Sequence, residues 1–186
     1  MTLGGLDRWP RTCAVSGTDS RPDRVTGYPD GSFRPAAPVT RQALAAYLYR
    51  LGGRPFGDHP SCFGPAPFTD VPASSPFCGE IAWLKAAHYT TGYPDGTFRP
   101  TASVTRDATA ALLYRWKNRT SGVPTPCVLQ PFTDVAVDSP FCGHIAWMKE
   151  HHVTNGYPDG TYHPRRTVDR QTIAAFLSRT EAFTTF

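Results

Sequence analysis

Apolar side chains recur along the chain in short stripes with the spacing of one helix face. Two stretches carry them at i, i+4 and i+7, namely Phe77, Ile81, Leu84 and Phe141, Ile145, Met148. These stripes predict helices over Pro76–His88 and Pro140–His152. Each expected helix follows an N-cap candidate and has proline at its first position, in the pairs Ser75-Pro76 and Ser139-Pro140.

A second type of stripe begins after a capping residue, and it occurs in three places. The expected helices start behind Thr40, Thr105 and Asp169. Their apolar faces include Leu44, Tyr47, Leu48 and Leu51 in the first, and Ile173, Phe176 and Leu177 in the last. No such helix can bury its stripe alone, so neighbouring copies must pack together.

The stripes follow an internal repeat marked by the run GYPDG, which starts at Gly27, Gly92 and Gly156. Each unit runs from Phe-Thr-Asp-Val through a helix, the GYPDG run and an Arg-Pro or His-Pro exit to a second helix. We expect copy 1 over residues 27–54, copy 2 over 55–117 and copy 3 over 118–186. Residues 1–26 lack a first-helix stripe, and we expect a degenerate, poorly ordered segment there.

Composition narrows the possible classes of protein. Hydrophobic residues make up 40% and charged residues 18%, with 19 Pro and 16 Gly, which is typical of a globular chain rich in loops. The net charge of +4 contains no basic run, so we expect no nucleic-acid partner. No stretch has the length of a membrane span, and the start MTLGGLDRWPRTC lacks the apolar core of a signal peptide.

The cysteines keep the same register as the repeat. Cys78 and Cys142 stand at equivalent places, with Cys62 and Cys127 shortly before them, so we predict the disulfides Cys62–Cys78 and Cys127–Cys142. Free thiols or a zinc site are the alternatives, and the zinc site lacks short paired-ligand spacing. Paired cysteines favour an oxidising, extracellular place. Cys13 is left without a mate, which suggests that the natural protein starts upstream, with an export signal and a further module.

Taken together, the motifs resemble the S-layer homology (SLH) repeat. The features that carry the resemblance are the Phe-Thr-Asp-Val entry, the GYPDGTFRP loop and the Thr-Arg start of the second helix. It covers Pro67–Trp116 and Pro131–Arg179 fully, and Val25–Leu51 in part. The resemblance implies a mainly α fold of tandem helix–loop–helix repeats in a pseudo-threefold spindle, with copy 1 incomplete.

The resemblance also implies a role. SLH repeats attach surface proteins non-covalently to cell-wall polysaccharide, often a pyruvylated polymer, in grooves between repeats around an arginine of a Thr-Arg-Ala-Glu motif. This chain keeps the arginine three times and loses the glutamate three times, with Ala43, Ala108 and Thr172 in its place. Loss of the glutamate removes the reciprocal hydrogen bond of a capping box. It also leaves undetermined which ligand the arginine binds and how tightly.

Candidate binding residues follow from the motifs. Arg41, Arg106 and Arg170 stand in the first helical turn, where a guanidinium and free backbone amides suit an anion; structural arginines are the alternative. Tyr28, Tyr93 and Tyr157 either line a sugar groove or pack under the loop. Trp83 and Trp147 either stack on a sugar or, more in keeping with burial of aromatic rings, pack on a neighbouring copy.

The Pro-Asp-Gly part of each loop predicts a β-turn rather than a calcium site, because one carboxylate per loop is too few for calcium. Asp70 and Asp134 are expected to tie the entry turn. We expect no metal or cofactor. No catalytic motif is present, so we expect no enzyme.

The leading hypothesis is anchoring to cell-wall polysaccharide at the cell surface. One alternative is a self-associating surface module that has lost polymer binding. The other, with least support, is a hydrolase of wall glycans. The groove beside copy 1 is expected to be the weakest.

Overall fold

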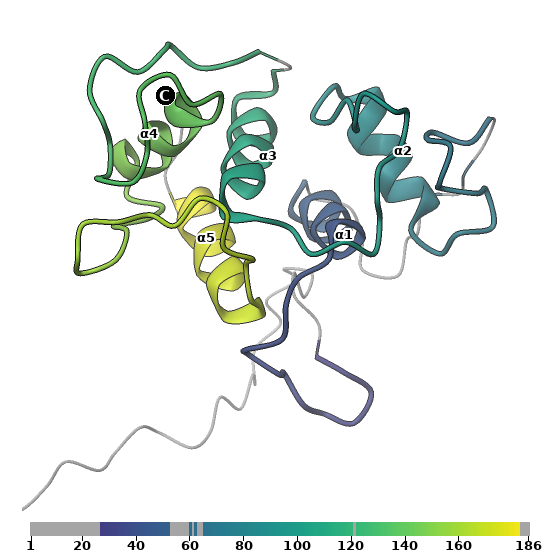
Figure 1. The fold of residues 1–186 in the computed structure, drawn as a ribbon. Coiled ribbons are helices and arrows are strands. Elements are labelled where there is room, and N and C mark those ends of the chain that lie inside the picture. Colours follow the sequence, from purple (N-terminus) through teal and green to yellow (C-terminus); the bar gives the residue numbers. More distant parts are fainter. Residues whose placement is uncertain (1–26, 53–59, 61, 63–64, 121, 183–186) are drawn as a thin grey trace, which may run out of the picture.

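The computed structural model describes residues 27–52, 60, 62, 65–120 and 122–182. Within these ranges the chain forms five helices and isolated β-bridges, without a strand. The helices are α1 (Arg41–Leu51), α2 (Cys78–Ala86), α3 (Arg106–Asn118), α4 (Cys142–Glu150) and α5 (Arg170–Ala182), as Figure 1 shows. The prediction of a mainly α fold is confirmed. The expected degenerate segment 1–26 and Cys13 lie outside the described residues.

The first helices of copies 2 and 3 start later than predicted. α2 begins at Cys78 and α4 at Cys142, after Phe77 and Phe141, and neither start has a side-chain cap. The assignment of Ser75 as an N-cap is therefore wrong, and Ser139 does not cap α4 either. Instead each serine opens a turn, because the amide of Cys78 donates to the carbonyl oxygen of Ser75 at 3.0 Å, and Cys142 does the same to Ser139 at 2.9 Å.

The second helices start where the capping residues predicted. The Thr40 hydroxyl accepts from the amide of Ala43 at 3.3 Å, and the Asp169 carboxylate accepts from the amide of Thr172 at 2.8 Å. α3 departs from this pattern. The Thr105 side chain donates to the Asp107 carboxylate, and that carboxylate accepts from the amide of Ala108 instead.

Helix packing crosses the copy boundaries. α1 of copy 1 packs on α2 of copy 2, and α3 packs on α4 in the same way, while α3 also touches α5. The predicted stripes form the core of these contacts: Leu44, Leu48, Ile81, Leu84, Ile145, Met148 and Ile173 are all fully buried. Leu113 of α3 is fully buried with them. The copy limits at residues 54 and 117 stay a prediction, but the packing shows that no copy buries its helices alone.

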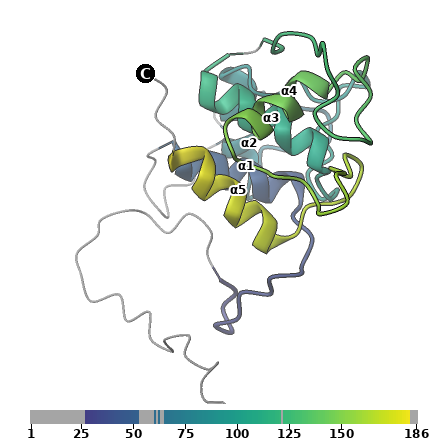
Figure 2. The same cartoon turned by 90° about the vertical axis from the view of Figure 1, so that its left-hand side faces the viewer.

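A closed ring of main-chain hydrogen bonds holds the three copies together. The amide of Val39 donates to the carbonyl oxygen of Val168, Val168 donates to Val104, and Val104 donates to Val39, each at 2.9 Å. All three valines are buried, and β-bridges flank them. The copies therefore meet around a threefold-like centre, from which loop 27–38 of copy 1 leaves at the lower edge in Figures 1 and 2. The three-pronged spindle that the resemblance implies stays a prediction.

Both predicted disulfides are present in the structure. Cys62 and Cys78 lie 5.4 Å apart between Cα atoms, and Cys127 and Cys142 lie 5.9 Å apart. Each joins the loop that enters a copy to the first turn of its helix, and closing a loop of this length contributes about 3 kcal/mol in the chain-entropy account. The bonded loop lies so close that a Cβ on Gly79 would stand 1.5 Å from the Pro60 carbonyl oxygen. The glycine after each cysteine is thus a packing requirement.

Candidate functional site

Each Tyr-Pro-Asp-Gly run forms the predicted β-turn. In copy 2 the amide of Gly96 donates to the carbonyl oxygen of Tyr93 at 3.0 Å, and Gly96 has a φ of +78°, which favours glycine. The Asp95 carboxylate accepts from both the amide and the hydroxyl of Thr97, at 3.0 and 2.6 Å. The same contacts recur in copies 1 and 3.

The loop aspartate also fixes an arginine in copies 1 and 2. Asp95 forms an ion pair of 2.9 Å with Arg99, and Asp30 forms one of 2.7 Å with Arg34. The pKa of both aspartates is lowered to about 2, chiefly by the hydroxyl of Thr97 or Ser32. Each guanidinium carbon then lies 3.9 Å from the centre of the tyrosine ring of its own loop, Tyr93 or Tyr28.

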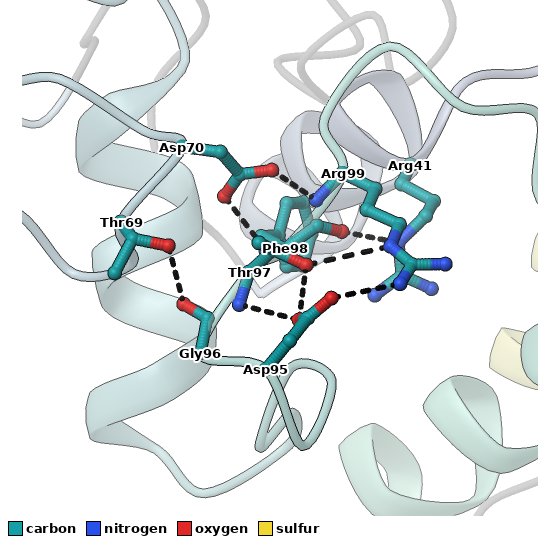
Figure 3. A network of polar contacts seen from close by, with 8 residues as sticks. All are labelled: Arg41, Thr69, Asp70, Asp95, Gly96, Thr97, Phe98 and Arg99. Atoms are coloured by element: carbon teal, nitrogen blue, oxygen red, sulfur yellow. Dashed lines mark hydrogen bonds and ion pairs between the residues drawn. The ribbon is translucent and has the colours of Figure 1, made fainter.

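The aspartate of Phe-Thr-Asp-Val clamps the loop exit. Figure 3 shows the Asp70 carboxylate between the amides of Phe98 and Arg99, both at 2.7 Å. Asp134 makes the same pair of bonds to copy 3, at Tyr162 and His163. The expectation that these aspartates tie their own entry turn is wrong: they hold the two residues 28 and 29 positions later, and the second of these is left-handed.

The helix arginines reach into the next copy. The Nε atom of Arg41 donates to the Phe98 carbonyl oxygen at 2.7 Å, and that of Arg106 donates to the Tyr162 carbonyl oxygen at 2.6 Å. Arg170 closes the cycle by donating to Phe33 of copy 1 at 2.7 Å. The alternative that these arginines are structural is therefore correct for the Nε edge of each guanidinium.

The backbone amides of the helix starts do not remain free for an anion. The amides of Arg41 and Gln42 donate to carbonyl oxygens of the copy 2 loop, each at 2.9 Å. Equivalent bonds at 3.0 Å cover the first two amides of α3 and α5. The proposed help from these amides is thus wrong, and any anion at these positions must bind the side chains.

Each loop tyrosine lies beside the helix arginine of a neighbouring copy. The guanidinium carbon of Arg41 is 4.9 Å from the Tyr93 ring centre, that of Arg106 is 5.1 Å from Tyr157, and that of Arg170 is 4.9 Å from Tyr28. The tyrosines are half-buried. We call these places the copy 1–2 site (Arg41, Tyr93, Arg99), the copy 2–3 site (Arg106, Tyr157, His163) and the copy 3–1 site (Arg170, Tyr28, Arg34).

These sites share an arrangement of positive charge beside an aromatic ring. In the copy 1–2 and copy 3–1 sites, two guanidinium groups from different elements face one tyrosine ring. For Arg41 and Arg106, no hydrogen bond within the described residues engages the two terminal nitrogens. A guanidinium edge of this kind matches a carboxylate or phosphate, and an exposed ring face packs on a sugar.

The copy 3–1 site matches the copy 1–2 site closely. The ring distances are 4.9 and 3.9 Å in both, and both Nε bonds measure 2.7 Å. One contact differs, because Arg170 also donates to the Tyr47 hydroxyl at 2.8 Å. The expectation that the site beside copy 1 is the weakest stays a prediction.

The structure brings the tryptophans to helix interfaces instead of these sites. The Trp83 ring meets Tyr49 of α1 edge-on at 5.3 Å. Trp147 is only 7% exposed and meets Tyr114 of α3 in the same way at 5.4 Å. Packing between neighbouring copies, the alternative stated for Trp83 and Trp147, fits this geometry.

Sequence reasoning missed the loop-exit arginines Arg34 and Arg99. The signal was present, because the Asp30–Arg34 and Asp95–Arg99 spacings are equal and both pairs lie in the repeated loop. In copy 3 the equivalent residue is His163, whose ring centre lies 4.7 Å from that of Tyr157.

Across the described ranges, no three His, Cys, Asp or Glu side chains gather as a metal site would require. None of the five helices combines the length and apolar character needed to cross a bilayer.

Comparison with known proteins identifies the family. Residues 25–45, 67–110 and 131–174 match the family model of the S-layer homology domain, and together they make up more than half of the chain. The chain belongs to the S-layer homology family. The three matched segments contain the three loop tyrosines and the three helix arginines, so the SLH motif and the sites described above coincide.

Two relatives of this SLH chain come from Acetivibrio thermocellus. "Cell surface glycoprotein 1" is 27% identical over 164 residues, which cover 83% of this chain and 7% of that protein. "Cellulosome-anchoring protein" is 28% identical over 174 residues, which cover 88% of this chain and 36% of that protein. The chain thus spans less than half the length of either relative.

Proposed function

We propose that this SLH chain anchors a protein to the bacterial cell surface by binding an anionic polysaccharide of the cell wall at the sites between copies. One observation carries the proposal: a half-buried tyrosine lies beside an inter-copy arginine three times, and twice a second arginine faces the same ring. Family membership and the printed names of the two relatives support the surface location and the anchoring role over a catalytic one.

The chemistry of the sites favours a sugar that carries a carboxylate. The guanidinium can bond both oxygens of such a group, while the ring covers the apolar face of the sugar. A pyruvyl ketal, which adds a carboxylate to a wall sugar, fits this description. The glutamate that the motif lacks is not needed to hold the arginine, because the Nε bond and the flanking rings already do so.

Co-sedimentation with purified wall sacculi that retain their secondary polymer tests the proposal. The wild-type chain should pellet, and Arg41→Ala, Arg106→Ala and Arg170→Ala should each reduce the bound fraction. Mild acid, which hydrolyses ketals, should reduce the capacity of the sacculi.

The arginines also support the fold, so a second set of variants is required. Tyr93→Leu and Tyr157→Leu keep an apolar group of similar burial but remove the ring, and they should weaken binding while the helical circular dichroism stays unchanged. Arg119→Asn is the matched control, because it removes one positive charge at a left-handed residue (φ 49°) that asparagine tolerates. A wild-type chain that stays in the supernatant would contradict the proposal, and concentration-dependent self-association would then favour the structural alternative.

A further inference from the structure

The copy 2–3 site differs from the other two in its charged residues. Copy 3 has Arg165 and Arg166 after its loop exit, where copy 1 has Ala36 and Ala37 and copy 2 has Thr101 and Ala102. Arg166 is exposed, and its guanidinium carbon lies 5.6 Å from the Tyr157 ring centre. Arg166 thus brings to Tyr157 the second guanidinium that Arg99 brings to Tyr93.

Main-chain contacts fix Arg166 beside the helix arginine. The amide of Arg106 donates to the carbonyl oxygen of Arg166 at 3.0 Å, and the two guanidinium groups share the Tyr157 ring. Among the described residues no ion pair joins Asp159 to Arg166; Asp159 accepts from the amide and hydroxyl of Thr161, at 3.0 and 2.6 Å. In copy 2, by contrast, Asp95 neutralises Arg99 directly.

Arg165 is held by a residue that only copy 2 has. Asp107, which replaces Gln42 and Gln171 of the other copies, lies 3.7 Å from the Nε atom of Arg165. The carboxylate is buried and the arginine side chain is 85% exposed. These two unusual residues therefore meet across the copy boundary.

A hollow of about 360 Å³ adjoins these arginines, lined by Asp134, His163, Pro164, Arg165 and Arg166. Both oxygens of its one carboxylate, on Asp134, accept main-chain amides at 2.7 Å, and one lies 3.7 Å from His163 Nδ1. The hollow thus presents two arginines and a histidine, and one of the arginines, Arg165, is paired with Asp107.

We infer that the copy 2–3 site binds two neighbouring anionic groups of one glycan, the first at Arg106 and the second in the hollow at Arg165 and Arg166. The copy 1–2 site lacks this second position and binds one. This inference rests on the proposed function and specifies its ligand: an acidic glycan segment whose charged groups lie on successive sugars.

Titration with galacturonic acid and with its linear trimer tests the inference, with amide chemical shifts of residues 156–160 and 92–96 reporting the two sites. At any site that binds a single anion, the trimer binds about threefold more tightly than the monomer for statistical reasons alone. At the copy 2–3 site the affinity of the trimer should exceed that of the monomer by at least about tenfold. Its affinity should also depend more steeply on salt, because more charges pair.

Two variants decide between the outcomes. Arg165→Ala with Arg166→Ala should reduce the trimer gain in affinity at residues 156–160 to the statistical factor. Thr101→Arg with Ala102→Arg should confer the larger gain on residues 92–96. Equal gains at both sites in the wild type, or an unchanged gain in the first variant, would overturn the inference.

The experiment separates this inference from the proposed function. A chain that discriminates the trimer but does not pellet with sacculi keeps the two-anion site and loses the anchoring role. A chain that pellets with sacculi but gains equally from the trimer at both sites keeps the anchoring role and loses the two-anion site.

Discussion

The Nε atom of Arg170 donates a 2.7 Å hydrogen bond to the carbonyl oxygen of Phe33, 137 residues earlier in the chain. The same guanidinium donates to the Tyr47 hydroxyl at 2.8 Å. One arginine of the last helix thus connects copy 3 to both the loop and the helix of copy 1. A residue considered for ligand binding therefore also holds the ends of the repeat array together.

Arg170→Ala should destabilise the fold by about 2–3 kcal/mol, because it leaves a carbonyl and a hydroxyl without their charged donor. Urea unfolding followed by circular dichroism measures the change. Arg119→Asn, which removes a charge outside these contacts, should stay within about 0.5 kcal/mol of the wild type. Equal stability of Arg170→Ala and the control would show that the closure contributes nothing.

The two glycines of one loop should respond differently to alanine. Gly92 and Gly96 have φ values of +72° and +78°, so alanine strains both. Only Gly92 lacks room: a Cβ there would lie 2.4 Å from the Phe68 ring, whereas at Gly96 the nearest atom is 3.6 Å away. Gly96→Ala should cost about 1 kcal/mol and Gly92→Ala about 3 kcal/mol or more.

Urea unfolding of the two variants side by side provides the measurement, and Gly156→Ala with Gly160→Ala repeats the comparison in copy 3. Costs that are equal within each pair would contradict the close approach of the phenylalanine ring.

Thr97→Val should raise the pKa of Asp95 from about 2 toward its ordinary range, because the Thr97 hydroxyl is the largest cause of the depression. A carboxylate-detected NMR titration reads this directly. Asp30 in the same molecule retains Ser32 and should stay near 2, which makes it an internal control. In the wild type the stabilisation by these carboxylates is present above the unfolded pKa of about 3.9 and is lost as pH falls toward 2.

His144 should make the protein less stable in mild acid. Burial, aided by the charge of Arg115, lowers its pKa to about 4. The unfolded chain, with a histidine pKa near 6.5, binds the proton more readily. The contribution is therefore complete above about pH 6.5 and is lost progressively as pH falls to about 4, by at most about 3 kcal/mol.

Denaturant midpoints measured between those pH values test this, with His144→Gln as the comparison. The variant should show a flatter profile, and the difference between the two curves isolates His144 from the other histidines. Parallel curves would contradict the prediction.

Local features of the fold could be predicted from the sequence because they depend on near neighbours. The stripe of Leu44 and Leu48 and the turn at Tyr93–Gly96 follow from spacing and turn chemistry. The disulfide partners could be predicted from the repeat register, because the cysteines of each pair stand at equivalent positions in two copies.

What the sequence did not predict depends on which distant group a polar atom meets. Asp70 looked like a local cap, yet its partners, Phe98 and Arg99, lie beyond α2 at the exit of the next loop. The amides of Arg41 and Gln42 looked free, yet carbonyl groups of the next copy occupy them. Periodicity predicts which face of a helix is buried. It does not predict which distant backbone segment packs against the first turn of that helix.

The ring of Val39, Val104 and Val168 sets a limit on how such a protein can evolve. An open stack of repeats can grow by duplication at either end, because each unit touches only its neighbours. Here every donor of the ring already has its acceptor, so a fourth unit inserted in the chain would find no place at the centre. If the chain binds as proposed, stronger binding must then come from changing individual sites or from joining whole triplets in tandem.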